Sequence, residues 1–329
     1  MQKDTPGVNP FGYGVPVPPQ YFAGRVEQRA DLKARVGGIS AQSVSVVGLH
    51  RSGKSSLLQY IAGRIHEFCL PEQNPLVITL DLQSKSLHTP EGIVEGLRRR
   101  IERQTGHTPW RTDQNSDGFA VDDGLEALRD SNVRLLVQLD EFERIAARLD
   151  LFQEWGEDFR AKASAGYFAM ILSTRRPLAE IYDECGLTSP FGNIFSTITL
   201  GALKRTEWMD FVRNSFARTG MTVSDVDLAL IEELSGGLPF YMQMAASLLW
   251  QHRDQDKTRQ AFRVQSSERF RELWSALSPA ERSALRRAIG SGGQPPLAPG
   301  VVDDLERHGL LRDGDVFSSA FASFVQEQR

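Results

Sequence analysis

A glycine-rich loop that carries a lysine and a serine links an apolar run to a helical pattern. Residues 48–55 read GLHRSGKS and follow VSVV at 44–47. Gly48, Gly53, Lys54 and Ser55 fit the pattern G-x-x-x-x-G-K-[ST] without a mismatch, between a predicted strand and a predicted helix. The backbone N–H groups of such a loop converge on phosphate oxygens, and the positive end of the following helix adds to their field. The loop therefore predicts a phosphate-binding site, with a plain glycine-bounded turn as the alternative.

The side chains of this loop have separate expected roles. Lys54 would reach the β- and γ-phosphates of a nucleotide. Ser55 would place its hydroxyl on Mg²⁺, a hard cation that prefers oxygen ligands. The other residues expected to line the phosphate site are Gly48, His50, Arg51, Ser52, Gly53 and Ser56.

Two carboxylates follow another predicted strand, in the segment LLVQLDE at 135–141. Asp140 would hold the Mg²⁺ together with Ser55. Glu141 would orient and deprotonate the attacking water as a general base. An acidic helix N-terminus is the alternative interpretation, because the helix dipole favours Asp and Glu there.

A third predicted strand ends in Ser173-Thr174-Arg175-Arg176. In a sheet of this kind the strand lies beside the acidic one, so a cation at its end can contact the γ-phosphate and report its presence. We expect Arg175 to do so. The alternative is that both arginines are solvated charges at the end of a strand.

The elements that must position these residues alternate along the first part of the chain. Short apolar runs and amphipathic segments follow one another, as in a parallel sheet covered by helices. The expected strands are 43–47, 76–82, 133–139, 168–173 and 194–200, each mostly apolar, as strands buried on both faces should be. The expected helices are 54–67, 90–103, 119–130 and 151–164, and the polar stretch 106–118 is expected to be a loop.

Helical patterns replace the strands after residue 200. They lie at 204–218, 223–235 and 239–252, and the polar stretch 253–257 is expected to be a linker. Helices at 265–276, 279–288 and 300–309 and a hairpin at 310–319 that turns at Asp313-Gly314 are the parts of a winged helix. The predicted fold class is α/β, a P-loop NTPase parallel sheet with a helical lid domain and a C-terminal winged-helix domain. The expected parts are an extended arm at 1–20, an ATPase core at 21–202, a lid at 203–256 and a winged helix at 257–329.

The composition is that of a soluble globular protein with more than one domain. The chain has 329 residues, of which 40% are hydrophobic and 24% charged, and its net charge is −4. Cys69 and Cys185 lack metal-ligand spacing, which argues against a disulfide scaffold or a zinc site. The N-terminus does not resemble a secretory signal, and no apolar run reaches the roughly 18 residues of a membrane span. We therefore expect a cytoplasmic protein that does not bind membranes.

Four segments resemble the STAND branch of the AAA+ ATPases and its archaeal-type and origin-recognition relatives. They are Phe22-Ala23-Gly24-Arg25, Asp140-Glu141, Ser173-Thr174-Arg175 and Gly237-Leu238-Pro239. The resemblance implies ATP or ADP as the nucleotide, with Gly24 and Arg25 near the adenine. It also implies that Pro239 packs on the base and couples the helical domain to the nucleotide. A helix stop followed by a helix-starting proline explains Gly237-Leu238-Pro239 as well, and both interpretations can hold together.

Two departures from the origin-recognition relatives favour STAND-like switching over a fast motor. Leu187-Thr188 stand where those relatives usually carry an arginine before a Ser-Phe-Gly-like stretch. The helix that begins with Phe240 has no arginine near its start.

The charge of the C-terminal domain weighs against DNA binding. Residues 264–329 contain eight arginines and no lysine against nine acids, and the third helix carries Asp303, Asp304 and Glu306. Because phosphate contacts dominate nucleic-acid affinity, such a face should bind weakly. Two basic groups argue the other way: Arg282, Arg286 and Arg287 in the C-terminal domain, and Arg98, Arg99, Arg100 and Arg103 in the core.

The expected function is an ATP-binding switch that hydrolyses ATP slowly and changes conformation or assembly state between its ADP and ATP forms. The expected partners are further copies of the chain and a separate effector or adaptor protein. One rival is a DNA-bound AAA+ protein, an initiator or a transposition regulator. The other rival is an interaction module whose bound nucleotide is never turned over.

Overall fold

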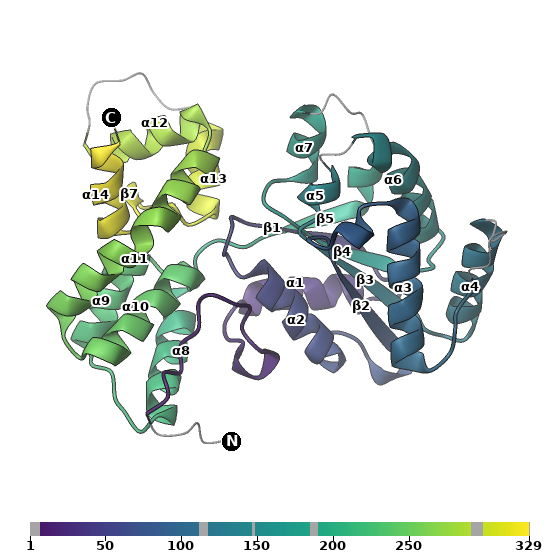
Figure 1. Cartoon of the computed structure of the whole chain (residues 1–329), viewed down its shortest axis with the longest axis horizontal. Coiled ribbons are helices and arrows are strands. Elements are labelled where there is room, and N and C mark those ends of the chain that lie inside the picture. The colour runs from purple at the N-terminus through teal and green to yellow at the C-terminus, as the bar shows by residue number, and fades with distance from the viewer. Residues whose placement is uncertain (1–6, 112–117, 147–148, 185–189, 291–298, 329) are drawn as a thin grey trace.

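Five short apolar segments form one parallel sheet in the first part of the chain (Figure 1). The computed structural model describes residues 7–111, 118–146, 149–184, 190–290 and 299–328. The sheet has the order β2-β3-β4-β1-β5 and all of its pairings are parallel. Its carboxyl ends therefore meet at one edge, where β1, β3 and β4 bring the loop, the acids and the arginine together. The strands are β1 (Ser43–Val47), β2 (Pro75–Asp81), β3 (Arg134–Asp140), β4 (Ala169–Thr174) and β5 (Phe195–Thr199).

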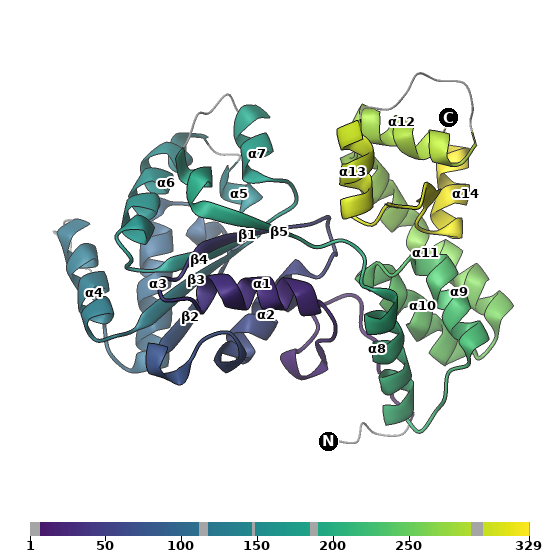
Figure 2. The same ribbon diagram turned by 180° about the vertical axis from the view of Figure 1, so that it is seen from behind.

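Helices cover both faces of this sheet, and each face has its own apolar core. One core packs α1 (Val26–Val36) and α2 (Lys54–Gly63) against the sheet. The other core packs the helices of the opposite face against the sheet. Figure 2 shows the molecule from the side opposite to Figure 1. The helices of this second core are α3 (Pro90–Thr105), α4 (Gly118–Asp130), α5 (Glu143–Ala146), α6 (Leu149–Ser164) and α7 (Leu178–Glu184). Short 3₁₀ helices are η1 (Pro19–Tyr21), η2 (Ile65–Glu67), η3 (Pro71–Gln73), η4 (Lys85–Leu87) and η5 (Pro190–Ile194).

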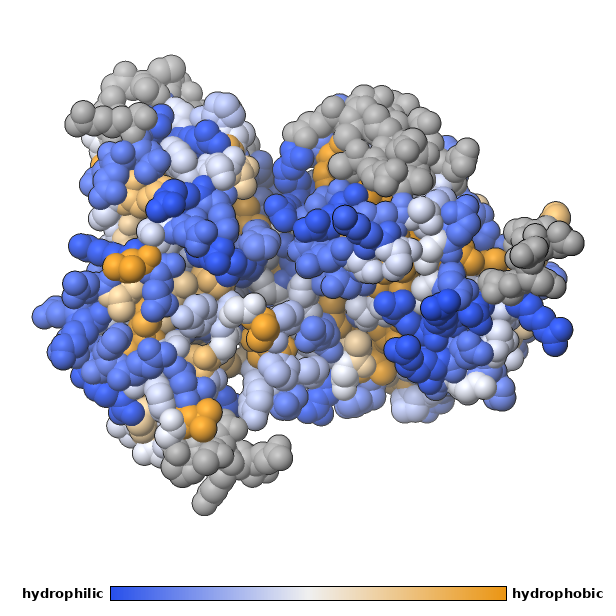
Figure 3. All heavy atoms as spheres, viewed as in Figure 1, coloured by the Kyte–Doolittle hydropathy of each residue, from blue (hydrophilic) through white to orange (hydrophobic). Residues whose placement is uncertain are grey.

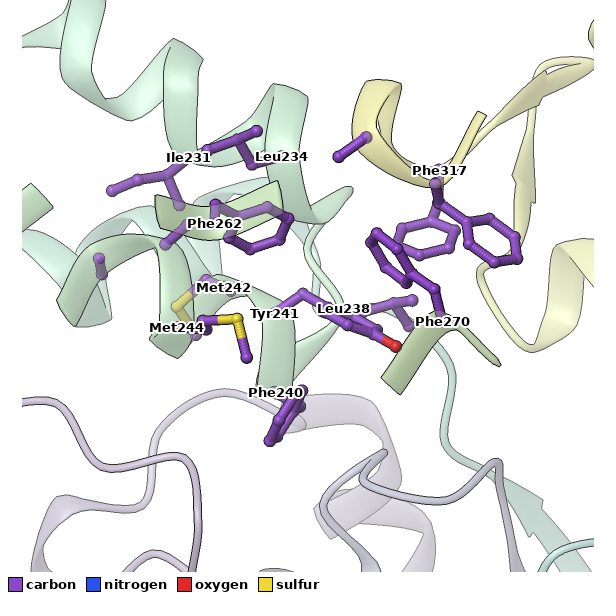
Figure 4. Packing of buried hydrophobic residues seen from close by; sticks show 14 of the residues in the cluster. Ile231, Leu234, Leu238, Phe240, Tyr241, Met242, Met244, Phe262, Phe270 and Phe317 are labelled. Atoms are coloured by element: carbon purple, nitrogen blue, oxygen red, sulfur yellow. The ribbon is translucent and has the colours of Figure 1, made fainter. Parts of the chain in front are cut away.

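The second half of the chain is helical and shares a third apolar core. Three helices, here called the lid helices, are α8 (Arg205–Arg218), α9 (Asp225–Ser235) and α10 (Pro239–His252). The long helix α11 (Gln255–Ala276) runs from them to the C-terminal unit, which comprises α12 (Pro279–Ala288), α13 (Pro299–Arg307), β6 (Leu311–Arg312), β7 (Asp315–Val316) and α14 (Ser319–Glu327). The ring centre of Tyr241 in α10 lies 5.2 Å from that of Phe270 in α11 and 5.6 Å from that of Phe317 in the C-terminal unit, and Figure 4 shows these residues together with Leu238. Lid helices and C-terminal unit are thus packed on one continuous core.

The predicted linker at 253–257 is wrong, because helix α11 begins there. Arg253 adopts a left-handed conformation that ends α10, and the Asp254 side chain accepts a hydrogen bond from the Lys257 N–H that starts α11. A left-handed residue followed by an N-cap aspartate makes a tight helix-to-helix corner out of polar residues. The helix predicted at 54–67 is divided at Arg64 into α2 and η2. The predicted hairpin is confirmed, and Asp313 and Gly314 have the positive φ angles of a type I′ turn.

The described part of the N-terminal arm is extended and packs along the lid. Phe11 is buried against the rings of Phe211 and Phe216 of α8. Asn9 donates a hydrogen bond to the Ser247 hydroxyl over 2.8 Å, and the Tyr13 hydroxyl donates to the Gln265 side chain over 2.9 Å. Residues 9–13 therefore bind to the helical half, although the chain continues directly into the sheet half.

The face of the molecule in Figure 3 is mostly hydrophilic, with apolar side chains in small groups. None of the described helices combines the length and the apolar character that a membrane span requires. Cys69 is buried with a free thiol, and Cys185 lies outside the described residues.

Candidate nucleotide site

The phosphate-binding loop folds tightly between β1 and α2. Gly48 leaves no room for a side chain, because a Cβ there would lie 2.4 Å from the Ser52 hydroxyl and 2.8 Å from the Leu200 carbonyl oxygen. Gly53 has a φ of 96° and stands directly before the first residue of α2. The hydroxyl of Ser52 is buried without a hydrogen-bond partner among the described residues. An enclosed loop with an unpaired polar group at a helix N-terminus fits an anion.

Lys54 is buried at the start of α2 and bends back into the loop. Its ammonium donates hydrogen bonds to the carbonyl oxygens of Gly48 (2.7 Å) and Leu49 (3.0 Å). Burial lowers the pKa of Lys54, while Glu143, Glu141 and Asp140 oppose that shift. The ammonium thus occupies the concave side of the loop and faces three carboxylates.

The acids lie at the end of β3, beside the end of β4. The Ser173 hydroxyl donates a hydrogen bond to Oδ1 of Asp140, which also accepts one from the Glu141 N–H over 3.1 Å. The second oxygen of Asp140 accepts no hydrogen bond from the described residues, so it is free to bind a cation. Glu141 has a φ of 57°, and this left-handed turn redirects the chain as it leaves the strand. Its side chain reaches the pocket described below.

Arg175 extends from the end of β4 toward these acids. Its Nε lies 2.9 Å from Oε1 of Glu143, and its Nη2 lies 3.7 Å from Oε2 of Glu141. Burial raises the pKa of Glu143, and the neighbouring Glu141 adds to this shift. The backbone N–H of Glu143 itself and the charges of Lys54 and Arg175 oppose it. Two cations and three carboxylates thus meet at the open end of the loop.

Arg25 is buried behind the loop and holds three segments together. Its guanidinium donates hydrogen bonds to the carbonyl oxygens of Gly201 (2.6 Å), Ser52 (3.0 Å) and Ala202 (3.4 Å). Burial lowers the pKa of Arg25 to about 10. Gly24 beside it faces Glu207 and Leu203 at the start of the lid. Arg25 therefore ties the phosphate-binding loop to the crossing from β5 into the lid helices.

A pocket of about 350 Å³ opens next to the loop, between the sheet half and the lid helices. This volume is within the range of small-molecule sites. The N-terminal arm contributes residues 12–17 to its wall, and the lid contributes Phe211, Pro239, Phe240, Met242 and Gln243. The arm is fixed there at both ends, since the Gly12 N–H donates to Gln243 (3.3 Å) and the Val17 N–H donates to the hydroxyl of Ser56 (3.0 Å).

Two consecutive loop residues, His50 and Arg51, also line the pocket. The guanidinium of Arg51 lies 4.2 Å from the ring centre of Phe240, which Figure 4 shows apart from the rest of its cluster. The pKa of Arg51 is lowered by burial and by Arg269 of α11. The pKa of His50 is lowered by burial and by the charges of Arg175, Arg51 and Lys54. Positive charge therefore accumulates at the loop, as an anion site requires.

The geometry and the sequence agree with one family of nucleotide-binding proteins. A profile of the family described as novel STAND NTPase 1 matches residues 7–289. The chain belongs to this family. The sequence matches none of the curated proteins.

The fold of this STAND NTPase is similar to those of archaeal proteins of known structure. A Walker-type ATPase of Pyrococcus abyssi is 14% identical with a TM-score of 0.67, and the match covers 96% of this chain and 99% of that one. The ORC2 protein of Aeropyrum pernix, solved in ADPNP–ADP complexes, is 17% identical with a TM-score of 0.54. This match covers 97% of this chain and 88% of the ORC2 chain. The predicted P-loop NTPase fold is thereby confirmed, since likeness at such identities reports the fold.

Most residues predicted for the site of this NTPase line the pocket beside the loop. They are Arg25, His50, Arg51, Ser52, Gly53, Lys54, Ser55, Ser56, Glu141 and Pro239. Four others lie outside its wall. The Gly48 carbonyl oxygen accepts a hydrogen bond from Lys54, and Asp140 accepts one from the Glu141 N–H. Arg175 pairs with Glu143, and Gly24 packs against Glu207 and Leu203 at the start of the lid. Leu187 and Thr188 lie outside the described residues.

Sequence reasoning missed two contributors to the site. The extended arm at 12–17 gave no helical or strand pattern, and only its position before the Phe22–Arg25 segment connects it with the nucleotide-binding core. Glu143 stands three residues after Asp140 in the sequence. This closeness to Asp140 was the available signal that a further acid lies at the same edge of the sheet.

Proposed function

We propose that this STAND NTPase binds ATP with Mg²⁺, hydrolyses it slowly, and changes conformation or oligomeric state between its ADP and ATP forms. The observation that carries the proposal is a buried lysine within a phosphate-binding loop, facing carboxylates in a pocket that three separate parts of the chain close. A nucleotide in this pocket would touch the sheet half, the arm and the lid together. Its phosphates can therefore bias how these parts are arranged.

Each residue at the acid end has a role in this proposal. Lys54 exchanges its two loop carbonyls for the β- and γ-phosphates. Glu141, open to the pocket, orients the water and accepts its proton, and Arg175 contacts the γ-phosphate. The hydroxyl of Ser55 and the free carboxylate oxygen of Asp140 are hard oxygen donors that fit Mg²⁺. When bound, Mg²⁺ would neutralise charge on the phosphates.

Adenine is the proposed base. The pocket wall on the side of the arm and lid is aromatic and apolar, with Tyr21, Phe22, Phe211 and Phe240, which suits stacking on a base. Arg25 and Pro239, the first residue of α10, also line the pocket, and Gly24 precedes Arg25 in the chain. The similar ORC2 protein was solved with ADPNP and ADP, which supports an adenine nucleotide here.

The proposed output is contact with a separate effector or adaptor protein, or with further copies of the chain. DNA is the less favoured partner. Arg282 bonds the backbone of Trp274 and Ser275, and Arg286 bonds the backbone of Gln328. In the core, Arg98 and Arg99 pair with Glu95. The ion pairs with Glu95 offset positive charge in the core, and the backbone bonds engage guanidinium N–H groups of Arg282 and Arg286 that would otherwise contact phosphate oxygens.

Two substitutions test the proposal. Lys54→Ala should weaken ATP binding by at least about 100-fold, because it removes the buried charge that faces the phosphates. Glu141→Gln should retain binding and stop hydrolysis, since an amide cannot accept the proton. Binding is measured by calorimetry and turnover by phosphate release, with exposed Lys33→Ala as the control. Wild-type turnover is expected below about 0.1 per second, as for switch-type NTPases. Normal hydrolysis by the Glu141 variant would refute its role as the base.

A further inference from the structure

The carboxylate of Glu143 lies at the same edge of the sheet as Asp140 and Glu141. Glu143 is the first residue of α5, and its side chain is 21% exposed. Both carboxylate oxygens are buried, and neither accepts a hydrogen bond from another of the described residues. A carboxylate in this position costs free energy unless opposite charges face it.

Two cations supply those charges. Nε of Arg175 lies 2.9 Å from Oε1 of Glu143, close enough for an ion pair although the N–H is not aligned for a hydrogen bond. Among the three acids, Glu143 also exerts the largest opposing charge on Lys54, ahead of Glu141 and Asp140. Glu143 thus faces both cations of the site, which repel each other.

Glu141 is engaged more loosely than Glu143. Its Oε2 lies 3.7 Å from Arg175 and 3.9 Å from Arg144, and both distances are too long for hydrogen bonds. Glu141 lines the nucleotide pocket, whereas Glu143 does not. Arg175 is thus bound to the acid behind the pocket and leaves the acid in the pocket accessible.

We propose that Glu143 is a positioning residue that keeps Arg175 beside the γ-phosphate end of the pocket and prevents it from pairing tightly with Glu141. The proposal rests on the proposed ATP binding. Without the charge of Glu143, Glu141 becomes the nearest acid to Arg175. A close arginine–carboxylate pair would then occupy both the proposed base and the group that contacts the γ-phosphate.

The experiment compares the wild type with Glu143→Gln, Arg175→Ala and the double variant. The Kd values of ADP and of a non-hydrolysable ATP analogue are measured with Mg²⁺, together with kcat. Glu143→Gln should reduce the preference for the analogue over ADP by about threefold or more and kcat by about tenfold, while Kd for ADP changes less than about twofold. The double variant should be no worse than Arg175→Ala, because Glu143 acts through Arg175.

Controls separate this role from a structural one. Glu126→Gln removes an acid from an exposed ion pair with Arg129 and should leave every value unchanged. Glu143→Asp keeps the charge and should restore part of the loss, and Glu143→Ala replaces Glu143→Gln if that variant does not fold.

Three results would overturn the proposal. One is an unchanged preference for the analogue over ADP in Glu143→Gln. A second is a double variant whose loss of kcat or of preference equals the product of the losses in the two single variants. The third is hydrolysis that survives Glu141→Gln but not Glu143→Gln, which would make Glu143 the base. A wild-type chain that binds neither nucleotide would instead refute the proposed function.

Discussion

At the scale of single residues, buried cations bonded to backbone carbonyls shape the nucleotide site. Lys54 and Arg25 are both buried, and both donate to carbonyl oxygens of the phosphate-binding loop. A buried charge is tolerated only when such partners surround it. The carbonyls bonded by Lys54 belong to the loop itself, so phosphates can replace them. Those bonded by Arg25 lie in different segments, so Arg25 holds the fold together.

Arg25→Ala should lower the free energy of unfolding by about 2–3 kcal/mol, because it leaves three carbonyl oxygens without their donor. Arg25→Lys should restore little, since an ammonium cannot reproduce the planar fork of a guanidinium. Urea unfolding followed by tryptophan fluorescence measures both. Arg213→Ala, which breaks an exposed pair with Asp225, is the control and should change the free energy by less than about 0.5 kcal/mol. A lysine variant as stable as the wild type would contradict this account.

At the scale of elements, the N-terminal arm joins the lid helices to the phosphate-binding loop. Phe11 inserts between aromatic rings of the lid core, while the Val17 N–H bonds Ser56 at the first turn of α2. The arm has no regular secondary structure between residues 7 and 18, so its position depends on these contacts. It closes one wall of the pocket as a result.

Phe11→Ala should loosen the arm and weaken nucleotide binding by about fivefold or more, because part of the pocket wall is then no longer preorganised. Amide hydrogen exchange should accelerate at Gly12 and Val17, whose N–H groups bond side chains of α10 and α2. Val8→Ala is the matched control, since Val8 is 56% exposed. If affinity falls while exchange at Gly12 and Val17 stays slow, the arm is not the cause.

The elements that could be predicted from the sequence are those with a strong local pattern. All five strands were predicted close to their bounds. The three central strands β1, β3 and β4 are mostly buried runs, whereas the edge strand β5 is only partly buried. The loop, Asp140 and Arg175 followed from these strands, since parallel strands end at one edge. The corner at Arg253-Asp254 could not be distinguished from a linker, because both consist of polar residues. The partners of Arg25 and Glu143 come from segments distant in the sequence, which no local pattern encodes.

At the scale of the whole molecule, the C-terminal unit rests on the crossing between the sheet and the lid. A Cβ on Gly201 would lie 2.2 Å from the Arg307 carbonyl oxygen, and a Cβ on Gly309 would lie 2.7 Å from the Ala202 nitrogen. Arg25 bonds the carbonyl oxygens of Gly201 and Ala202 from the other side. A continuous set of contacts therefore connects the phosphate-binding loop with the C-terminal unit, and the proposed switch can act through it.

Gly201→Ala should displace the C-terminal unit, because the added methyl group overlaps backbone that cannot move aside alone. We expect a larger radius of gyration in solution X-ray scattering and ADP release that is at least about threefold faster. Gly300→Ala is the control, since a Cβ on Gly300 meets no atom within 4 Å. An unchanged scattering curve with an unchanged unfolding midpoint would show that the contact is not tight.

The proposed switch is tested most directly by solution X-ray scattering with in-line light scattering on wild-type protein saturated with ADP or with a non-hydrolysable ATP analogue and Mg²⁺. The radius of gyration and the absolute mass are compared between the two samples. The proposed function predicts a reproducible difference in at least one of them, and Lys54→Ala should show none. Identical curves and masses, with calorimetry confirming that each nucleotide is bound, would contradict a nucleotide-driven switch.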